Sequence, residues 1–393
     1  MRILFLDQSG KPGGAELCLL DVAKPYRDRC LVGLLADGPF RELLEQQSIP
    51  VKVLTQQSIQ VQKNSHILQG VLSLQSLIAP ITKAIELSRE CDLIYANTQK
   101  ALVVGAIASI LSRRPLVYHL HDIVSPEHFS ASNRQIITTL ANRVATWVIA
   151  NSHASQAAFI QAGGRPEKTT VIYNGFDPVP YQAASIQRER IRQELGICDR
   201  FVVGHFSRLS PWKGQHILIE ALAQCPANVI ALFVGDALFG EEAYVKQLYH
   251  QVNQLGLQER IQFLGFRSDI PALMSACDLV AHTSTAPEPF GRVIIEAMLC
   301  GRPVVAAAAG GAVELVQPGE TGWLVPPGDS LKLAEVIHQV QTNPARSQQI
   351  AQQAQRQASQ QFNLASTNHQ IAELLQAIVK PSLIKSCSNT PPG

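Results

Sequence analysis

Short apolar runs of strand length alternate with stretches of helical spacing along the first part of the chain. We expect strands at Ile3–Leu6, Cys30–Ala36, Val51–Leu54, Leu93–Ala96, Leu116–His119 and Trp147–Ala150. Helices are expected at Ala15–Ala23, Phe40–Gln47, Gly70–Ser88, Lys100–Leu111 and Asn133–Ala145. Strands that alternate with helices predict a parallel sheet that is covered on both faces.

The same alternation starts again after a break. The segment NGFDPVPY, which follows Val171–Tyr173, carries Asn, Gly and two prolines and is typical of a linker. A polar helix is expected next, at Ser185–Leu195. Further strands are expected at Phe201–Phe206, Val229–Gly235, Ile261–Leu264, Leu279–Thr283, Pro303–Ala306 and Gly322–Val325. Helices are expected at Gly214–Gln224, Glu242–Leu255, Asp269–Ala276, Arg292–Cys300 and Leu331–Thr342. The pattern predicts a second doubly wound sheet.

The C-terminal part is rich in glutamine. Ten glutamines lie between Gln339 and Gln361, yet alanines and an isoleucine recur there at helical spacing, which favours a solvated helical surface over the alternative of disorder. A last helix is expected at Ala365–Val379. The tail from Pro381 onwards is expected to be loose.

Length and composition indicate a two-domain globular protein. A chain of 393 residues exceeds the usual size of one core. We place the domains at 1–178 and 179–364, followed by the helix at 365–380 and the tail at 381–393. The net charge of +2 gives no electrostatic reason to expect nucleic-acid binding.

Cysteine spacing and the first residues bear on the compartment. The eight cysteines form no C-x-x-C pair, which indicates neither a zinc site nor a disulfide framework, and we expect reduced, mostly buried thiols. The five apolar residues before Asp7 are too few for a signal peptide, and no segment has the length of a membrane span. We therefore expect a cytoplasmic protein without transmembrane segments, and leave open a peripheral contact with the inner face of the membrane.

Two carboxylates lie around a predicted loop-to-helix junction. Glu288 belongs to the loop that contains Phe290 and Gly291, and Glu296 lies in the early turns of a helix that begins near Arg292. A helix N-terminus offers free N–H groups to phosphate, and the carboxylates could accept hydrogen bonds from sugar hydroxyls. The alternative for Glu296 is an acid that only stabilises the helix dipole.

Two cations belong to the loop SRLSPWKG, which follows a predicted strand. Arg208 and Lys213 are five residues apart, between Gly204 and Gly214. Together they could neutralise a diphosphate without a metal ion. The alternative is a pair of solvated surface cations.

Two further candidate groups lie in the first part of the chain. Gly13 and Gly14 lie between a strand and a helix and match neither G-x-G-x-x-G nor the Walker motif, so they form either a phosphate or sugar contact or a plain tight turn. His119 and His121 lie at the end of a predicted strand, on the same side of it. We expect His121 to be functional and His119 to be structural.

Other residues receive smaller roles or none. Gly310 and Gly311, with Glu314, form another loop-to-helix junction where small residues allow close packing, and we favour a structural role for them. His205, His216 and His282 show no ligand-like spacing, and no role is assigned to them.

Five segments together resemble a known family. They are GGAE from Gly13, SRLSPWKG from Ser207, PEPFG with Glu288, GG-x-x-E ending at Glu314, and TGWLVPPGD ending at Asp329. In this order they resemble the retaining glycosyltransferases of family 4. Ser207 departs from that family's pattern, which commonly has glycine before the arginine, and this could shift the phosphate loop slightly.

The resemblance implies an α/β GT-B fold, with two doubly wound Rossmann-like domains facing a central cleft. The N-terminal domain would bind the acceptor, the C-terminal domain the nucleotide-sugar, and the last helix would cross back to the N-terminal domain.

The resemblance also implies roles for individual residues. Arg208 and Lys213 would hold the donor diphosphate, Glu296 the ribose, and Glu288 the sugar hydroxyls. The remaining contacts would come from the backbone around Phe290 and Gly291, from the glycine loop at Gly13 and Gly14, and from His121 near the reacting sugar.

The implied reaction is the transfer of a sugar with retention of configuration, without cofactor or metal. The donor would be UDP- or GDP-linked and the acceptor a glycan, a lipid-linked molecule or a small molecule. Two alternatives stay open: a nucleotide-sugar 2-epimerase on the same fold, and a non-catalytic binding or scaffold protein.

Overall fold

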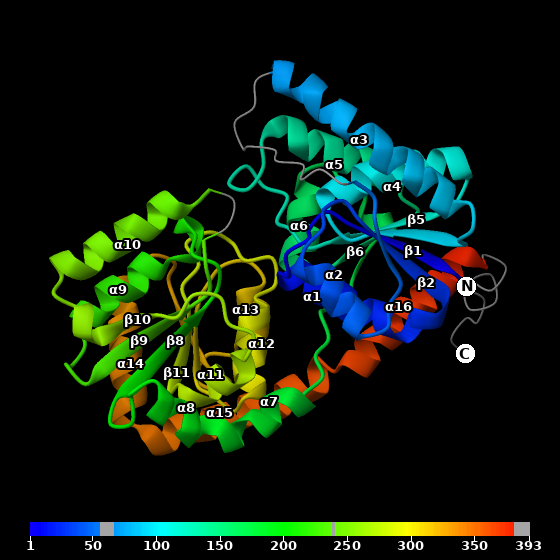
Figure 1. Ribbon diagram of the computed structural model, residues 1–393. Coiled ribbons are helices and arrows are strands. Elements are labelled where there is room, and N and C mark those ends of the chain that lie inside the picture. The colour runs from blue at the N-terminus through cyan, green and yellow to red at the C-terminus, as the bar shows by residue number, and fades with distance from the viewer. Residues whose placement is uncertain (56–66, 238–239, 381–393) are drawn as a thin grey trace, which may run out of the picture. The chain divides into compact units, whose positions relative to one another are not determined.

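The computed structural model describes residues 1–55, 67–237 and 240–380 of the chain. These residues form two units (Figure 1). The first consists of Met1–Gly175 together with helix α16 (Leu364–Val379), and the second of Phe176–Asn363. The expected tail at 381–393 lies outside the described residues.

The first unit is built on a seven-stranded sheet in the order β3-β2-β1-β4-β5-β6-β7, and all of its strand pairs are parallel. Its strands are β1 (Ile3–Asp7), β2 (Cys30–Leu34), β3 (Val51–Val53), β4 (Leu93–Ala96), β5 (Leu116–Leu120), β6 (Trp147–Ala150) and β7 (Thr169–Val171). Every residue of β1, β4 and β5 is buried, as expected for the central strands of a sheet with both faces covered.

Helices cover both faces of this sheet. They are α1 (Gly14–Ala23), α2 (Pro39–Gln46), α3 (Ile67–Ser88), α4 (Gln99–Ser112), α5 (Ala131–Arg143) and α6 (His153–Gln161). Figure 1 shows α3, α4 and α5 on one face and α1, α2 and α16 on the other. Ile371 and Leu375 of α16 belong to the same buried cluster as Ile3 and Phe5 of β1, so the C-terminal helix completes the core of the first unit.

The second unit is built on a six-stranded sheet in the order β10-β9-β8-β11-β12-β13, again with parallel pairs. Its strands are β8 (Phe201–Phe206), β9 (Val229–Val234), β10 (Ile261–Phe263), β11 (Leu279–His282), β12 (Val304–Ala307) and β13 (Trp323–Val325). Its helices are α7 (Val179–Ala183), α8 (Arg188–Glu194), α9 (Gln215–Ala223), α10 (Glu242–Gln254), α11 (Ile270–Ala276), α12 (Arg292–Leu299), α13 (Ala312–Leu315), α14 (Ser330–Thr342) and α15 (Pro344–Gln361).

The chain order reverses once in each sheet. In the first, the chain moves outward from β1 to β3 and then returns to β4 on the other side of β1; in the second, it moves from β8 to β10 and returns to β11. Ligand sites of open α/β sheets lie at the carboxyl ends of the strands at such a reversal. Ligand sites are therefore expected at the ends of β1 and β4 and at the ends of β8 and β11.

The α/β alternation predicted from the sequence is confirmed, with four corrections. The helix expected at Ser185–Leu195 is divided into a 3-10 turn (Ala184–Gln187) and α8. Strand β7 and helix α6 were not predicted, because two of the three residues of β7 are threonines and α6 mixes alanine with polar residues. Helix α7 was not predicted either, because it begins inside the Pro-containing segment that was expected to be a linker. Among the described residues, no helix combines the length and apolar character needed to cross a membrane.

The Gln-rich stretch is helical, and the alternative of disorder is wrong. Helix α15 buries Ile350, Ala351, Ala354 and Ala358 along one face while its glutamines are mostly solvent-exposed. The small alanines let this face approach its neighbour closely. The expected solvated helical surface is confirmed.

Candidate functional site

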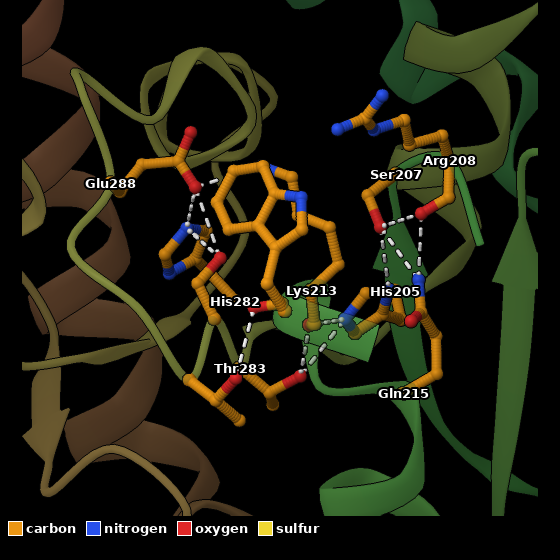
Figure 2. Close-up of polar contacts among 11 residues, drawn as sticks. His205, Ser207, Arg208, Lys213, Gln215, His282, Thr283 and Glu288 are labelled. Carbon is orange, nitrogen blue, oxygen red and sulfur yellow. Dashed lines mark hydrogen bonds and ion pairs between the residues drawn. The ribbon is translucent and has the colours of Figure 1, made fainter. Parts of the chain in front are cut away.

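A partly buried cation and a buried carboxylate meet at the reversal point of the second sheet. Lys213 ends the turn after β8, and Glu288 lies in the loop between β11 and α12. The Lys213 Nζ lies 2.7 Å from Glu288 Oε2. The same oxygen also accepts hydrogen bonds from His282 Nε2 at 3.0 Å and Ser284 Oγ at 3.0 Å. Figure 2 shows the cluster.

Glu288 is ionised in this position although it is buried. Its side chain is 10% exposed and that of Lys213 is 16% exposed. Burial alone would raise the pKa of the Glu288 carboxyl. The Lys213 ammonium and the hydrogen bond from His282 lower this pKa by a larger amount, so that it lies well below the ordinary value. The cluster is therefore a fixed negative charge with a cation in contact.

Close backbone packing holds the Lys213 loop in place. Gly214 has φ +70°, and a Cβ there would lie 2.0 Å from the carbonyl oxygen of Thr283, so only glycine fits. Thr283 Oγ1 lies 3.0 Å and 2.8 Å from the carbonyl oxygens of Lys213 and Gly214. His205 Nε2 lies 2.9 Å from the same hydroxyl. The end of β11 thus fixes the turn that carries the lysine.

A second glycine contact holds the Glu288 loop. Gly310 has φ +63°, and a Cβ there would lie 2.3 Å from the carbonyl oxygen of Glu288. The N–H of Gly311 donates to that same oxygen at 2.6 Å. The close packing predicted for this glycine pair is confirmed, and its target is the backbone of the candidate site residue.

Trp212 lies beside both cations of the loop. The Lys213 Nζ is 4.0 Å from the centroid of its ring, and the Arg208 guanidinium carbon is 5.8 Å from it. Arg208 and Lys213 are therefore arranged around one aromatic surface.

Ser207 is part of a hydrogen-bond network. Its hydroxyl accepts from Gln215 Nε2 at 2.9 Å and donates to the Arg208 carbonyl oxygen at 3.0 Å. Gln215 is fully buried and also donates to that carbonyl at 2.9 Å. A serine where the family commonly has glycine thus anchors the loop to the first turn of α9.

Helix α12 begins at Arg292, as predicted, with Gly291 as its N-cap at φ +100°. Phe290 is buried, and its ring lies 6.4 Å from that of Phe176. This contact anchors the side chain, so the backbone at Phe290 and Gly291 is held at the helix start. Glu296 lies one turn into α12, with its Oε1 3.5 Å from Arg292 Nε.

A polar chain runs across the reversal point of the first sheet. Asp7 at the end of β1 accepts a hydrogen bond from Asn97 Nδ2 at 2.7 Å, and Asn97 Oδ1 lies 2.9 Å from His121 Nε2. Asn97 Nδ2 also donates to the Ala15 carbonyl oxygen at 3.0 Å. Because both amide protons have acceptors, Asn97 Oδ1 accepts and His121 Nε2 is the donor.

Two buried carboxyl groups lie beside this chain. Burial raises the pKa of Asp7 to about 6 and, with the nearby Asp7 charge, raises the pKa of Glu16 to about 8. Gly13 caps α1 and Gly14 is its first residue. A Cβ on Gly13 would lie 2.8 Å from Glu16 Oε2, so the Glu16 side chain folds back to the start of its own helix.

The two histidines of the first unit lie on the same side of the chain, as predicted. Their ring centroids are 3.9 Å apart. His119 is 1% exposed, and its Nδ1 lies 2.7 Å from Tyr95 Oη. Burial lowers the pKa of His119 to about 3, so its imidazole is neutral.

The predicted site residues fall into two groups. In the second unit, the structure brings Lys213 into contact with Glu288, places Arg208 on the same loop, and places Phe290, Gly291 and Glu296 at α12. In the first unit, Gly13 and Gly14 open α1, and His121 follows β5. The partners His282, Ser284, Asn97 and Asp7 were not predicted from the sequence. Each of them lies at or just after the end of a strand at a reversal point. This position could not be recognised from the sequence, because the order of the strands in the sheet was not known from it.

Two family descriptions match the chain. Glycosyltransferase Family 4 matches residues 12–179, and Glycosyl transferases group 1 matches residues 187–357. The chain has the architecture of the GT-B class of proteins, with two parallel-sheet Rossmann-like units. The chain belongs to glycosyltransferase family 4, group 1, and the predicted family and fold are confirmed.

A solved relative covers nearly the whole chain. HepE of Anabaena (Alr3699), in complex with UDP-glucose, is 62% identical with a TM-score of 0.90, and the match covers 96% of this chain and 100% of that one. HepE has also been solved with UDP and glucose and with UDP.

Curated relatives match over shorter stretches. Spore coat protein SA of Bacillus subtilis (strain 168) is 28% identical over 235 residues, which are 56% of this chain and 61% of that protein. D-inositol 3-phosphate glycosyltransferase of Corynebacterium glutamicum (strain R) is 30% identical over 251 residues, 60% of each. The chain thus spans about three fifths of the length of these two relatives.

Proposed function

We propose that this protein is a retaining glycosyltransferase that moves a hexose from a UDP- or GDP-linked sugar to a hydroxyl group of an acceptor. The observation that carries the proposal is the Lys213–Glu288 pair at the reversal point of the second sheet. It provides a cation for phosphate and a carboxylate for sugar hydroxyls within one cluster. The complex of HepE with UDP-glucose makes UDP-glucose the first donor to test.

Arg208 and Lys213 act on the donor diphosphate. An ammonium has three N–H donors, and Glu288 takes one of those on Lys213, so the same lysine can also contact phosphate oxygens. Charge that develops on the leaving diphosphate is stabilised by cations that are already in place. No metal is required for that role.

Glu288 and Glu296 position the donor. The ionised Glu288 carboxylate accepts hydrogen bonds from the transferred sugar, and Glu296 accepts them from the ribose. The backbone N–H groups at Phe290 and Gly291, at the start of α12, receive the sugar or the distal phosphate, because a helix N-terminus presents unpaired donors.

The acceptor is bound by residues of the first unit. His121 is oriented by Asn97, which is itself held by Asp7, and this fixes which ring nitrogen carries the proton. Gly13 and Gly14 allow close approach of the chain at the start of α1. The acceptor is a glycan, a lipid-linked molecule or a small molecule.

A donor panel tests the proposal. The protein is incubated with UDP- and GDP-linked hexoses, each with and without glucose as acceptor, while melting temperature and nucleotide release are followed. A cognate donor at a hundredfold excess over its Kd should stabilise the fold by about 2.7 kcal/mol. Transfer should persist in EDTA, and the product should keep the anomeric configuration of the donor.

Two variants serve as controls for the site. Lys213→Ala and Glu288→Ala should each abolish transfer while the protein stays folded; full activity in both would refute the assignment. An epimerised nucleotide-sugar formed without acceptor would identify the 2-epimerase alternative. The absence of stabilisation by every nucleotide and nucleotide-sugar would favour a non-catalytic protein.

A further inference from the structure

Three side chains with metal-binding atoms converge inside the first unit. Cys18 lies on α1, His119 on β5 and His121 directly after β5. The Cys18 Sγ and one ring nitrogen of each histidine all lie within 4.8 Å of one another. Cys18 is 2% and His119 1% exposed, so two of these donors are enclosed by protein.

One ring nitrogen of His119 is unsatisfied. His119 Nε2 is buried and has no hydrogen-bond partner among the residues that the structure describes. A buried polar atom without a partner loses its hydration without compensation, at a cost of about 1–3 kcal/mol. A ligand that accepts the Nε2 lone pair would remove that cost.

The surrounding groups match those that orient metal-binding histidines. A histidine that binds a metal through one ring nitrogen usually donates the other N–H to an oxygen. Tyr95 Oη lies 2.7 Å from His119 Nδ1, which leaves Nε2 for the ion. Asn97 Oδ1 orients the ring of His121.

We propose that Cys18 Sγ, His119 Nε2 and a ring nitrogen of His121 bind one transition-metal ion of the Zn²⁺ and Co²⁺ class. Zn–S and Zn–N distances of about 2.3 and 2.0 Å require the donors to approach one another by roughly 1 Å. On binding, the Cys18 thiol loses its proton to solvent and its sulfur lone pair bonds the metal. Asn174, whose Oδ1 now accepts from Cys18 Sγ at 3.2 Å, turns its amide to donate to the thiolate.

Three protein ligands leave the fourth tetrahedral position open for water or another oxygen ligand. When an ion is bound at this site, His121 is one of its ligands and cannot contact substrate at the same time. Binding of the ion itself does not depend on the proposed glycosyl transfer and is measured without any nucleotide-sugar.

Cobalt titration of the full-length protein tests the proposal. After chelator treatment, Co²⁺ is added and the tetrahedral and thiolate-to-metal absorption bands are recorded. We expect one equivalent to bind with both bands present. Cys18→Ser should remove the thiolate band, and His119→Gln should weaken binding at least about tenfold. Cys91→Ser, a buried cysteine of the same unit, and the exposed Cys198→Ser should leave both bands unchanged.

X-ray absorption of the zinc-loaded wild-type protein gives a second test that needs no variant. The expected first coordination sphere has one sulfur and two imidazole nitrogens. A sphere of oxygen and nitrogen only, or a thiolate band that persists in folded Cys18→Ser, would overturn the proposal.

Discussion

Glu288 stays ionised because three donors surround one of its oxygens. Lys213, His282 and Ser284 all contact Oε2. A buried charge is tolerated only when such partners are present. Removal of one partner therefore affects both stability and the proposed donor site, and the two effects can be separated by a second substitution.

Lys213→Met should lower kcat/KM at least about a hundredfold, since the cation proposed to stabilise the leaving group is lost. It should also destabilise the second unit by about 3 kcal/mol, because the Glu288 carboxylate is left without its cation. Chemical denaturation and steady-state kinetics measure these effects. In Lys213→Met/Glu288→Gln the stability should largely return while activity stays lost; a double variant less stable than Lys213→Met would contradict this account.

Glu16 should make stability depend on pH in the opposite sense to Glu288. Its pKa is about 8 in the folded protein and 4.5 ordinarily, so the folded state retains a proton that the unfolded state releases. Stability should fall as pH rises from 4.5 to 8, by a total on the order of a few kcal/mol. Glu16→Gln should flatten the melting temperature between pH 6 and 8, above the Asp7 pKa of about 6.

The control for this experiment is Glu42→Gln, which changes an exposed acid in the first turn of α2. It should melt with the wild-type pH profile. A Glu16→Gln protein with an unchanged slope in that pH range would show that Glu16 is ionised in the folded state.

At the scale of elements, both loops of the second-unit site are held by glycines. Gly214 approaches Thr283, and Gly310 approaches the Glu288 backbone. The two loops follow β8 and β11, which are neighbours at the reversal of chain order. Backbone-to-backbone contact between them is what brings residues 213 and 288 together.

Gly310→Ala should destabilise the protein and weaken donor binding. The left-handed φ costs about 1 kcal/mol, and the added methyl group would also overlap the Glu288 carbonyl oxygen. The matched control is Gly319→Ala, which has φ +77° and open space around its Cβ. Gly319→Ala should be destabilised only by the cost of the left-handed conformation. Urea denaturation measures the stability of both variants, and donor KM should be raised in Gly310→Ala alone. An equal donor KM in both variants would argue against a role for the contact between Gly310 and the Glu288 backbone.

At the scale of the whole molecule, the last helix is tied to the first strands. Leu375 of α16 is fully buried in the cluster that includes Ile3 and Phe5. The first unit is thus made from both ends of the chain, whereas the second is one continuous segment.

Leu375→Ala should destabilise the first unit by about 3 kcal/mol, because a buried leucine is replaced and a cavity remains. Hydrogen exchange should accelerate in β1 and β2 more than in β8 and β9. Gln376→Ala, at the exposed neighbouring position, is the control and should change neither. Equal acceleration in both sheets would contradict the separation into two units.

Most of the fold could be predicted from the sequence. The spacing of apolar residues along a segment, and their number, depend directly on whether the segment is a strand or a helix. Every predicted strand has a counterpart in the two sheets, and the start of α12 at Arg292 was predicted correctly. The short strand β7 and helix α6 could not be predicted, since neither carries a distinct period. The partner histidine His282 was dismissed for its spacing, although it contacts Glu288.

The sequence by itself determined the alternation of strands and helices, the family, and the residues that carry charge at the proposed site. The tertiary structure decided which of these residues meet. Lys213 and Glu288 are 75 positions apart, and Asp7 and Asn97 are 90 apart. They are in contact because the order of strands, a long-range property, places β8 beside β11 and β1 beside β4. Local sequence patterns predict where the strands are, but not which strands lie side by side in the sheet.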